Sequence, residues 1–354
     1  MRQFELDLMR VLALFLLFAF HSYLSVLYPG MWFVETYLLS AFFLVSGYLF
    51  AKSLASKPPK DVIKSRLGRI YVPFLLALLL YFVLSQIVAL FFSPAQLSAW
   101  GLYDMIRGFL QPLSYVFHAT GLSIFYVLSS GNFGLYHLWF IVHLFAYFFL
   151  FLGISRLSGN KKSAAAIAVF IFLMALWSSE LIFRLEWKFE FFFLVFYCGF
   201  WLAQNSRLEK FYGMTWQIPC LVLLAAAATI DTPTFGVSSP FLKDFLGNMA
   251  FTLTRDAFAI SSVLVTLWAF HRIKPGDRLQ AFTKSVSGSS IQAYLLQPVV
   301  SSLVVSILIV LNGGPIGLGV IIIGVVLSFA LGIFIAGVVQ KDLEKLTTAV
   351  SKRS

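Results

Sequence analysis

The chain has 354 residues, of which 60% are hydrophobic, 18% aromatic and 12% charged. Soluble globular domains carry about 25% charged residues, so this composition excludes a soluble globule and indicates a polytopic membrane protein. Only two cysteines are present, which argues against a disulfide framework. The net charge of +11 fits contact with anionic membrane lipids and gives no reason to expect a nucleic-acid partner.

Apolar segments of membrane-spanning length recur along the whole chain. They predict an all-α fold of about ten transmembrane helices, forming a single domain over residues 1–354 with both termini in the cytoplasm. The expected spans are about 9–28, 36–51, 72–92, 136–154, 164–179, 190–204, 216–230, 250–270, 290–311 and 316–338. Most lysines and arginines then fall on the cytoplasmic side, as the positive-inside rule requires. The exceptions are Arg107, Arg184, Lys188, Lys243 and Arg255.

The first span begins with a cation, Arg10, and holds a lone imidazole, His21. At about 100° per residue the two side chains are expected on one helix face, about 16 Å apart. That distance places His21 near the middle of the bilayer, where an ionisable side chain is costly and usually points at a partner or a pathway. A snorkelling arginine, with a histidine bonded to a neighbouring helix, would give the same pattern.

The second span ends at Ser46-Gly47, where two helices are expected to approach closely. A cationic loop, Lys52–Arg69, follows, and Arg66 and Arg69 stand directly before the third span. Arginine pairs suit phosphate because each guanidinium can bind two oxygens. With Lys64 and Arg10 expected at the same depth, the loop predicts a site for a phosphorylated ligand. Lipid headgroups are the alternative ligand.

Two long segments are expected on the outer side, about 93–135 and 231–249. The second is rich in Pro, Gly and Ser and is predicted to be a mobile lid. His137 and Trp139 begin the fourth span, and His143 follows about 10 Å from the outer surface. The charged residues near the outer surface, such as Glu180 and the pair Arg255-Asp256, are candidates for sugar binding, although solvated loop charges look the same.

Four motifs occur in a fixed order within residues 4–144. They are Arg-x10-His in the first span, Phe-Phe-x-x-Ser-Gly-Tyr ending the second, Arg-x-x-Arg-x-x-x-Pro before the third, and Leu-Trp-Phe opening a later one. Together they resemble the acyltransferase-3 family of integral membrane acyltransferases. The resemblance covers the whole chain. No SGNH-type hydrolase domain is seen, as in the stand-alone members.

The resemblance implies transfer of an acyl group, most often acetyl, from cytoplasmic acyl-CoA to a hydroxyl of an extracytoplasmic polysaccharide or lipid-linked glycan precursor. Acetyl-CoA is the expected donor, no metal is expected, and the expected location is the cell inner membrane as a multi-pass protein. Membrane lipids, the glycan acceptor and polysaccharide synthesis machinery are the expected partners.

The same resemblance assigns roles to residues. His21 is the expected catalytic histidine, and Arg10 supports it or the donor. A neutral imidazole can deprotonate an acceptor hydroxyl or carry the acyl group itself, and the sequence leaves both routes open. The remaining candidates are Arg66, Arg69 and Lys64 for the CoA phosphates, and His143, His137, Trp139 and Glu180 for the acceptor.

Two departures from the family pattern stand out. Gln297 follows Tyr294-Leu295-Leu296 where many relatives carry a histidine, and His143 stands where some carry a glutamate. Two alternative functions remain: a glycan or lipid transporter that uses His21 and Arg10 as a coupling site, and a non-catalytic partner of a glycan synthase. Inverted repeats would favour the transporter, and the sequence shows none.

Overall fold

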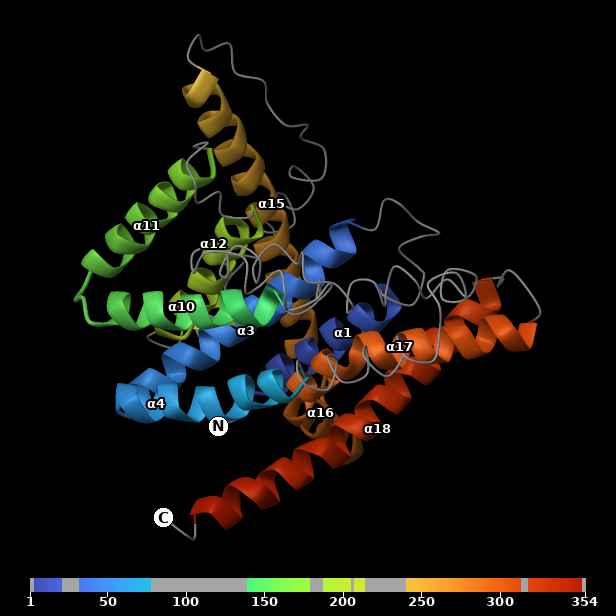
Figure 1. The fold of residues 1–354 in the computed structure, drawn as a ribbon. Coiled ribbons are helices and arrows are strands. Elements are labelled where there is room, and N and C mark those ends of the chain that lie inside the picture. The colour runs from blue at the N-terminus through green and yellow to red at the C-terminus, as the bar shows by residue number, and fades with distance from the viewer. Residues whose placement is uncertain are drawn as a thin grey trace, which may run out of the picture. The chain divides into compact units, whose positions relative to one another are not determined.

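The structure, a computed structural model, describes residues 3–20, 32–77, 139–178, 187–204, 207–213, 240–312 and 318–351. Within these ranges the chain is helical and contains no strand, which confirms the predicted helical class (Figure 1). The described residues fall into two compact units. The first lies within Met1–Leu38, Arg69–Leu110 and Ile273–Ser354, and the second within Leu39–Gly68 and Gln111–Arg272.

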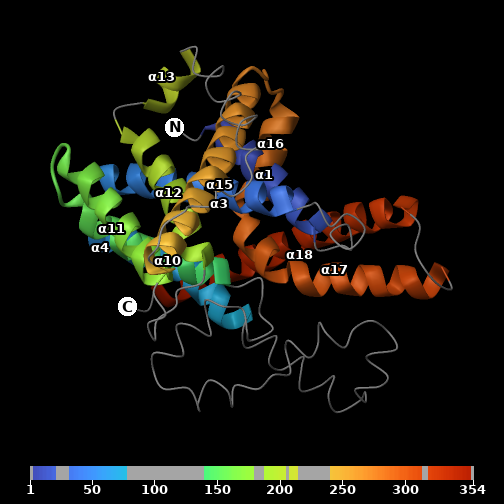
Figure 2. The same ribbon diagram turned by 90° about the horizontal axis from the view of Figure 1, so that it is seen from above.

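The first unit is built around the N-terminal helix. Its helices are α1 (Phe4–Ala19), α16 (Asp277–Gly288), α17 (Ser290–Asn312) and α18 (Leu318–Ser351), with the first residues of α3 (Trp32–Ser56). Helix α1 packs against α16, α17 and α18, while α17 and α18 lie side by side (Figures 1 and 2). Phe15 and Phe18 of α1 meet the Phe329 ring of α18 edge-on, with centroid distances of 5.3 and 5.8 Å.

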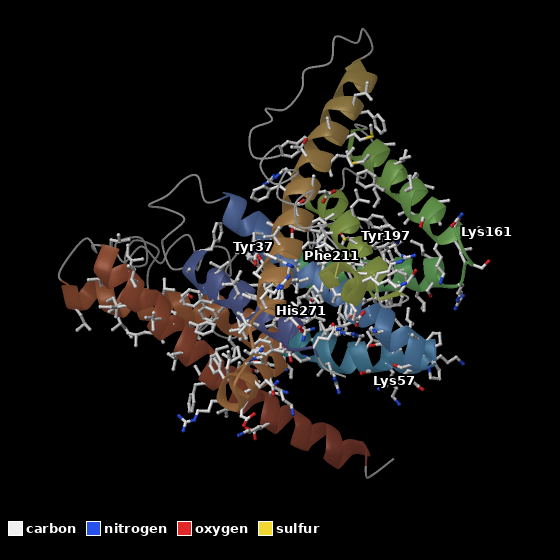
Figure 3. All side chains as sticks on the ribbon, turned by 180° about the vertical axis from the view of Figure 1, so that it is seen from behind. Tyr37, Lys57, Lys161, Tyr197, Phe211 and His271 are labelled. Atoms are coloured by element: carbon white, nitrogen blue, oxygen red, sulfur yellow. The ribbon has the colours of Figure 1, made fainter. Side chains whose placement is uncertain are left out.

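The second unit has an aromatic core. It contains the rest of α3 and the helices α4 (Pro59–Arg66), α10 (Trp139–Ser155), α11 (Lys161–Ser178), α12 (Trp187–Leu202), α13 (Arg207–Gly213) and α15 (Pro240–His271). The Phe43 ring of α3 stacks on Phe192 of α12 at 4.7 Å and contacts Tyr147 of α10 at 5.4 Å. Figure 3 marks Lys57 and Lys161 at the turns that join α3 to α4 and α10 to α11.

Glycine allows α3 and α12 to touch through their backbones. A Cβ on Gly47 would fall on the carbonyl oxygen of Phe196, and one on Gly199 would fall on the carbonyl oxygen of Leu44. The close approach predicted at Ser46-Gly47 is therefore confirmed. Its partner is α12, and the contact is reciprocal because each glycine faces the backbone of the other helix.

Most of the predicted spans lie in helices. The exceptions are 9–28 and 72–92, of which only 9–20 and 72–77 are described, and 216–230, which lies outside the described residues. Among the residues that the structure describes, three stretches are long and apolar enough to cross a bilayer: Tyr37–Ser56, Phe245–His271 and Leu318–Asp342. The chain thus contains membrane-spanning helices, while the total of about ten, the cytoplasmic termini and the single domain over 1–354 stay predictions.

The segments expected as loops contain more helix than the sequence indicated. Helix α15 begins at Pro240, so residues 240–249, expected in the outer lid, continue a membrane-spanning helix instead. Residues 231–239 and the other outer segment, 93–135, lie outside the described part. On the predicted cytoplasmic side, α4 forms within the cationic loop Lys52–Arg69, and α16 forms between the predicted spans 250–270 and 290–311.

Candidate functional site

Arg10 belongs to a buried polar network between α1 and α16. Its Nη1 donates a hydrogen bond to the Ser287 hydroxyl at 3.2 Å, and that hydroxyl donates to the Asp7 carboxylate at 2.6 Å. Asp7 is 6% exposed and Ser287 is 3% exposed. Asp7 and Arg10, three residues apart, share one face of α1. Ser287 therefore bridges the two charged side chains of α1 from a helix that is distant in sequence.

This network fixes the guanidinium of Arg10 before any ligand arrives. Charge-assisted hydrogen bonds are shorter and stronger than neutral ones, and a buried carboxylate needs such partners. Sequence reasoning named Arg10 but missed Asp7 and Ser287. The spacing of Asp7 and Arg10 was a readable signal, whereas the pairing with Ser287 joins residues too distant in the chain to be read from local patterns.

The expected catalytic histidine follows directly on the end of α1. The helix ends at Ala19, and Phe20 keeps helical dihedral angles of φ −59° and ψ −44°. His21 itself lies outside the described residues, as do His137 and Glu180. Trp139 is the first residue of α10. The predicted roles of these four residues stay predictions.

The predicted donor-binding residues lie on one continuous helical segment. Helix α4 has Pro59 in its first turn, Asp61 near its N-terminus, and Lys64 and Arg66 in its last turn, an order of charges that the helix dipole favours. A π-helical turn, Leu67–Tyr71, follows directly and contains Arg69. Such turns are rare and are frequent at functional sites.

The three basic side chains differ in exposure. Lys64 and Arg69 are exposed, and Arg66 is half-buried. The Arg66 guanidinium lies over the Phe148 ring of α10, 5.4 Å from its centroid, and Nη2 donates to the Ser53 hydroxyl of α3 at 3.5 Å. A guanidinium stacked through its face presents its N–H donors at the edge, which is how arginine binds phosphate oxygens. The Arg66 guanidinium is therefore held in place by protein contacts, whereas Lys64 and Arg69 are exposed.

His143 lies inside the second unit. It is 0% exposed on the buried stripe of α10, with Phe140, Leu144 and Tyr147 as further members. Helix α10 packs against α11 and α12. The imidazole is thus enclosed by protein, unlike a residue of an outer loop, and its predicted part in acceptor binding is untested.

Gln297 is also enclosed, within the first unit. It is 0% exposed on α17, and its Nε2 donates to the Ser301 hydroxyl at 3.1 Å. Its carbonyl Oε1 has no hydrogen-bond partner among the described residues. An amide donates and accepts hydrogen bonds but does not titrate near neutral pH, so Gln297 cannot act as the general base that a histidine would supply at this position.

Comparison with known proteins places the chain in a family. A family model described as an acyltransferase domain, that of the acyltransferase-3 family, matches residues 3–337, nearly the whole chain. No curated protein and no solved structure matches. The chain therefore belongs to the acyltransferase-3 family, and it is a membrane-embedded acyltransferase.

Proposed function

We propose that the protein transfers an acyl group, with acetyl the expected one, from acyl-CoA at the cytoplasmic face of the inner membrane to a hydroxyl of an extracytoplasmic polysaccharide or lipid-linked glycan precursor. Family membership supports acyl transfer. The observation that carries the choice of a CoA donor is the basic helical segment with Lys64, Arg66 and Arg69.

CoA suits this segment because it carries several phosphate groups. Arg66, stacked on Phe148, is held in one orientation, so less side-chain entropy is lost when it binds an anion. The exposed Lys64 and Arg69 add positive charge within the same stretch of helix. Lipid headgroups present the same chemistry, so donor binding must be measured directly.

The chemistry needs one imidazole. In a direct route, His21 takes the proton of the acceptor hydroxyl, the oxygen attacks the thioester carbonyl, and the thiolate of CoA leaves and is protonated. In a two-step route, the imidazole nitrogen attacks the thioester carbonyl and the CoA thiolate leaves with the imidazole N–H proton. The acceptor oxygen then displaces the imidazole from the acyl group, and the hydroxyl proton passes to the released imidazole. Arg10, held by Asp7 and Ser287, supplies a fixed positive charge on the same helix.

The donor half is tested by calorimetry with purified protein in detergent. Acetyl-CoA and succinyl-CoA should bind the wild type saturably, and Arg69→Ala should weaken binding of the preferred donor about tenfold, the loss of one charged hydrogen bond. Lys57→Ala is the matched control, because Lys57 is an exposed cation at the turn before α4 (Figure 3). An equal loss in both variants, or an effect of Arg69→Ala on the acceptor alone, contradicts the donor site.

A further inference from the structure

Asp256 is a buried carboxyl group inside a membrane-spanning helix. It lies on α15 within the apolar stretch Phe245–His271, about 16 Å from the Phe245 end, which is close to half the thickness of a bilayer core. Its side chain is 2% exposed. Both carboxyl oxygens lack a hydrogen-bond partner among the described residues.

The neighbours of Asp256 on α15 give its carboxyl oxygens no hydrogen bond, although the adjoining Arg255 attracts them electrostatically. The buried stripe of this helix contains Thr252, Asp256, Ala259, Val263 and Leu267, so two polar residues one turn apart precede an apolar run. Helix α15 packs against α11 and α12. The guanidinium of Arg255, the adjoining residue, lies over the ring of Phe251, 5.1 Å from its centroid.

An ionisable group at such depth is expensive, and in membrane proteins it usually marks a ligand or ion pathway. A buried carboxyl group needs hydrogen-bond partners in either form, as an acceptor when it is ionised and as donor and acceptor when it is protonated. Sugar hydroxyls serve both forms because they donate and accept hydrogen bonds. The chemistry thus favours the hydroxyl-rich acceptor substrate.

We infer that Asp256, with Thr252 one turn before it, binds the acyl acceptor through the hydroxyl groups of that acceptor. The inference rests on the proposed function and names a binding residue for its second substrate. The sequence already makes Arg255-Asp256 a candidate pair for sugar binding, but a solvated loop charge would give the same pattern. The buried position in the span distinguishes it from such charges.

The test compares Asp256→Asn and Thr252→Val with the wild type in an acyl-transfer assay at varied acceptor concentration. Asp256→Asn should raise the KM for the acceptor about 10- to 100-fold, and Thr252→Val by a smaller factor, while acetyl-CoA binding by calorimetry stays unchanged. The melting temperature of Asp256→Asn should stay the same or rise, because a buried carboxyl group without hydrogen-bond partners destabilises the fold. Thr254→Val is the matched control, since the Thr254 hydroxyl already donates to the Ala250 carbonyl at 2.9 Å.

The outcomes separate this inference from the function on which it rests. An unchanged acceptor KM in both folded variants overturns the role of Asp256 and leaves the proposed function standing. A lowered melting temperature of Asp256→Asn with an unchanged acceptor KM for Thr252→Val also overturns it, because a structural ion pair would then hold the carboxylate. Failure of the wild type to bind or turn over acetyl-CoA overturns the proposed function, and this inference with it.

Discussion

Replacing Ser287 with alanine removes the hydroxyl between Asp7 and Arg10. Two hydrogen bonds are lost, one to a carboxylate at 2.6 Å and one from a guanidinium at 3.2 Å. A hydrogen bond to a charged group contributes about 1.5–3 kcal/mol to stability. Alanine is a better helix former than serine, which offsets about 0.5 kcal/mol of the loss. Because Arg10 is only half-buried and its bond is longer, we expect Ser287→Ala to lower the free energy of unfolding by about 2 kcal/mol.

The assay is equilibrium unfolding in mild detergent with a fluorescence readout, with acyl transfer measured in parallel. Ser285→Ala is the control, because Ser285 is exposed on the same helix. Acyl transfer by Ser287→Ala should fall, since Arg10 loses the bond that orients it. Equal stability and equal activity of Ser287→Ala and Ser285→Ala would refute the role of this network.

The remaining predictions concern glycines at close contacts. Gly199→Ala places a methyl group on the Leu44 backbone and should destabilise the protein by about 3 kcal/mol or more, seen as loss of folded protein in detergent size-exclusion chromatography. Gly332→Ala meets the ring of Phe18, a side chain that can shift, and should cost about 1–2 kcal/mol in thermal unfolding. Gly153→Ala has no neighbour within 4 Å and should be neutral or slightly stabilising. A Gly153→Ala protein as unstable as Gly199→Ala would contradict this steric ranking.

Local patterns predicted the helices that lie in the bilayer. Long apolar runs leave the backbone no partner except itself, so segments such as 36–51 and 316–338 could be recognised by hydropathy alone. The Ser46-Gly47 contact was also foreseen, because small residues in a span indicate close packing. The partner of this contact, the backbone of Phe196, could be identified only from the three-dimensional structure.

The amphipathic and long-range features were not predicted. Helix α16 begins after Gly276, with Asp277 in its first turn, and buries Thr283, Val286 and Ser287. This spacing is typical of an amphipathic helix, but the segment is too polar to be recognised by hydropathy. The sequence marks Asp256 as a sugar-binding candidate within the span 250–270, but its enclosure by protein and the start of α15 at Pro240 come from the structure alone. The Asp7–Ser287–Arg10 network joins residues that are 280 and 277 positions apart in the chain, so only the tertiary structure reveals it.

The most direct measurement of the central claim is acyl transfer by the His21→Ala variant. Membranes containing wild type or variant would receive acetyl-CoA labelled in the acetyl group, and the label in the cell-surface polysaccharide fraction would be counted. Wild-type membranes should transfer label, and the variant, inserted in equal amount, should transfer none, because no other residue is expected to activate the acceptor hydroxyl or carry the acetyl group. Undiminished transfer by a well-folded His21→Ala protein would contradict the assignment of His21 as the catalytic residue.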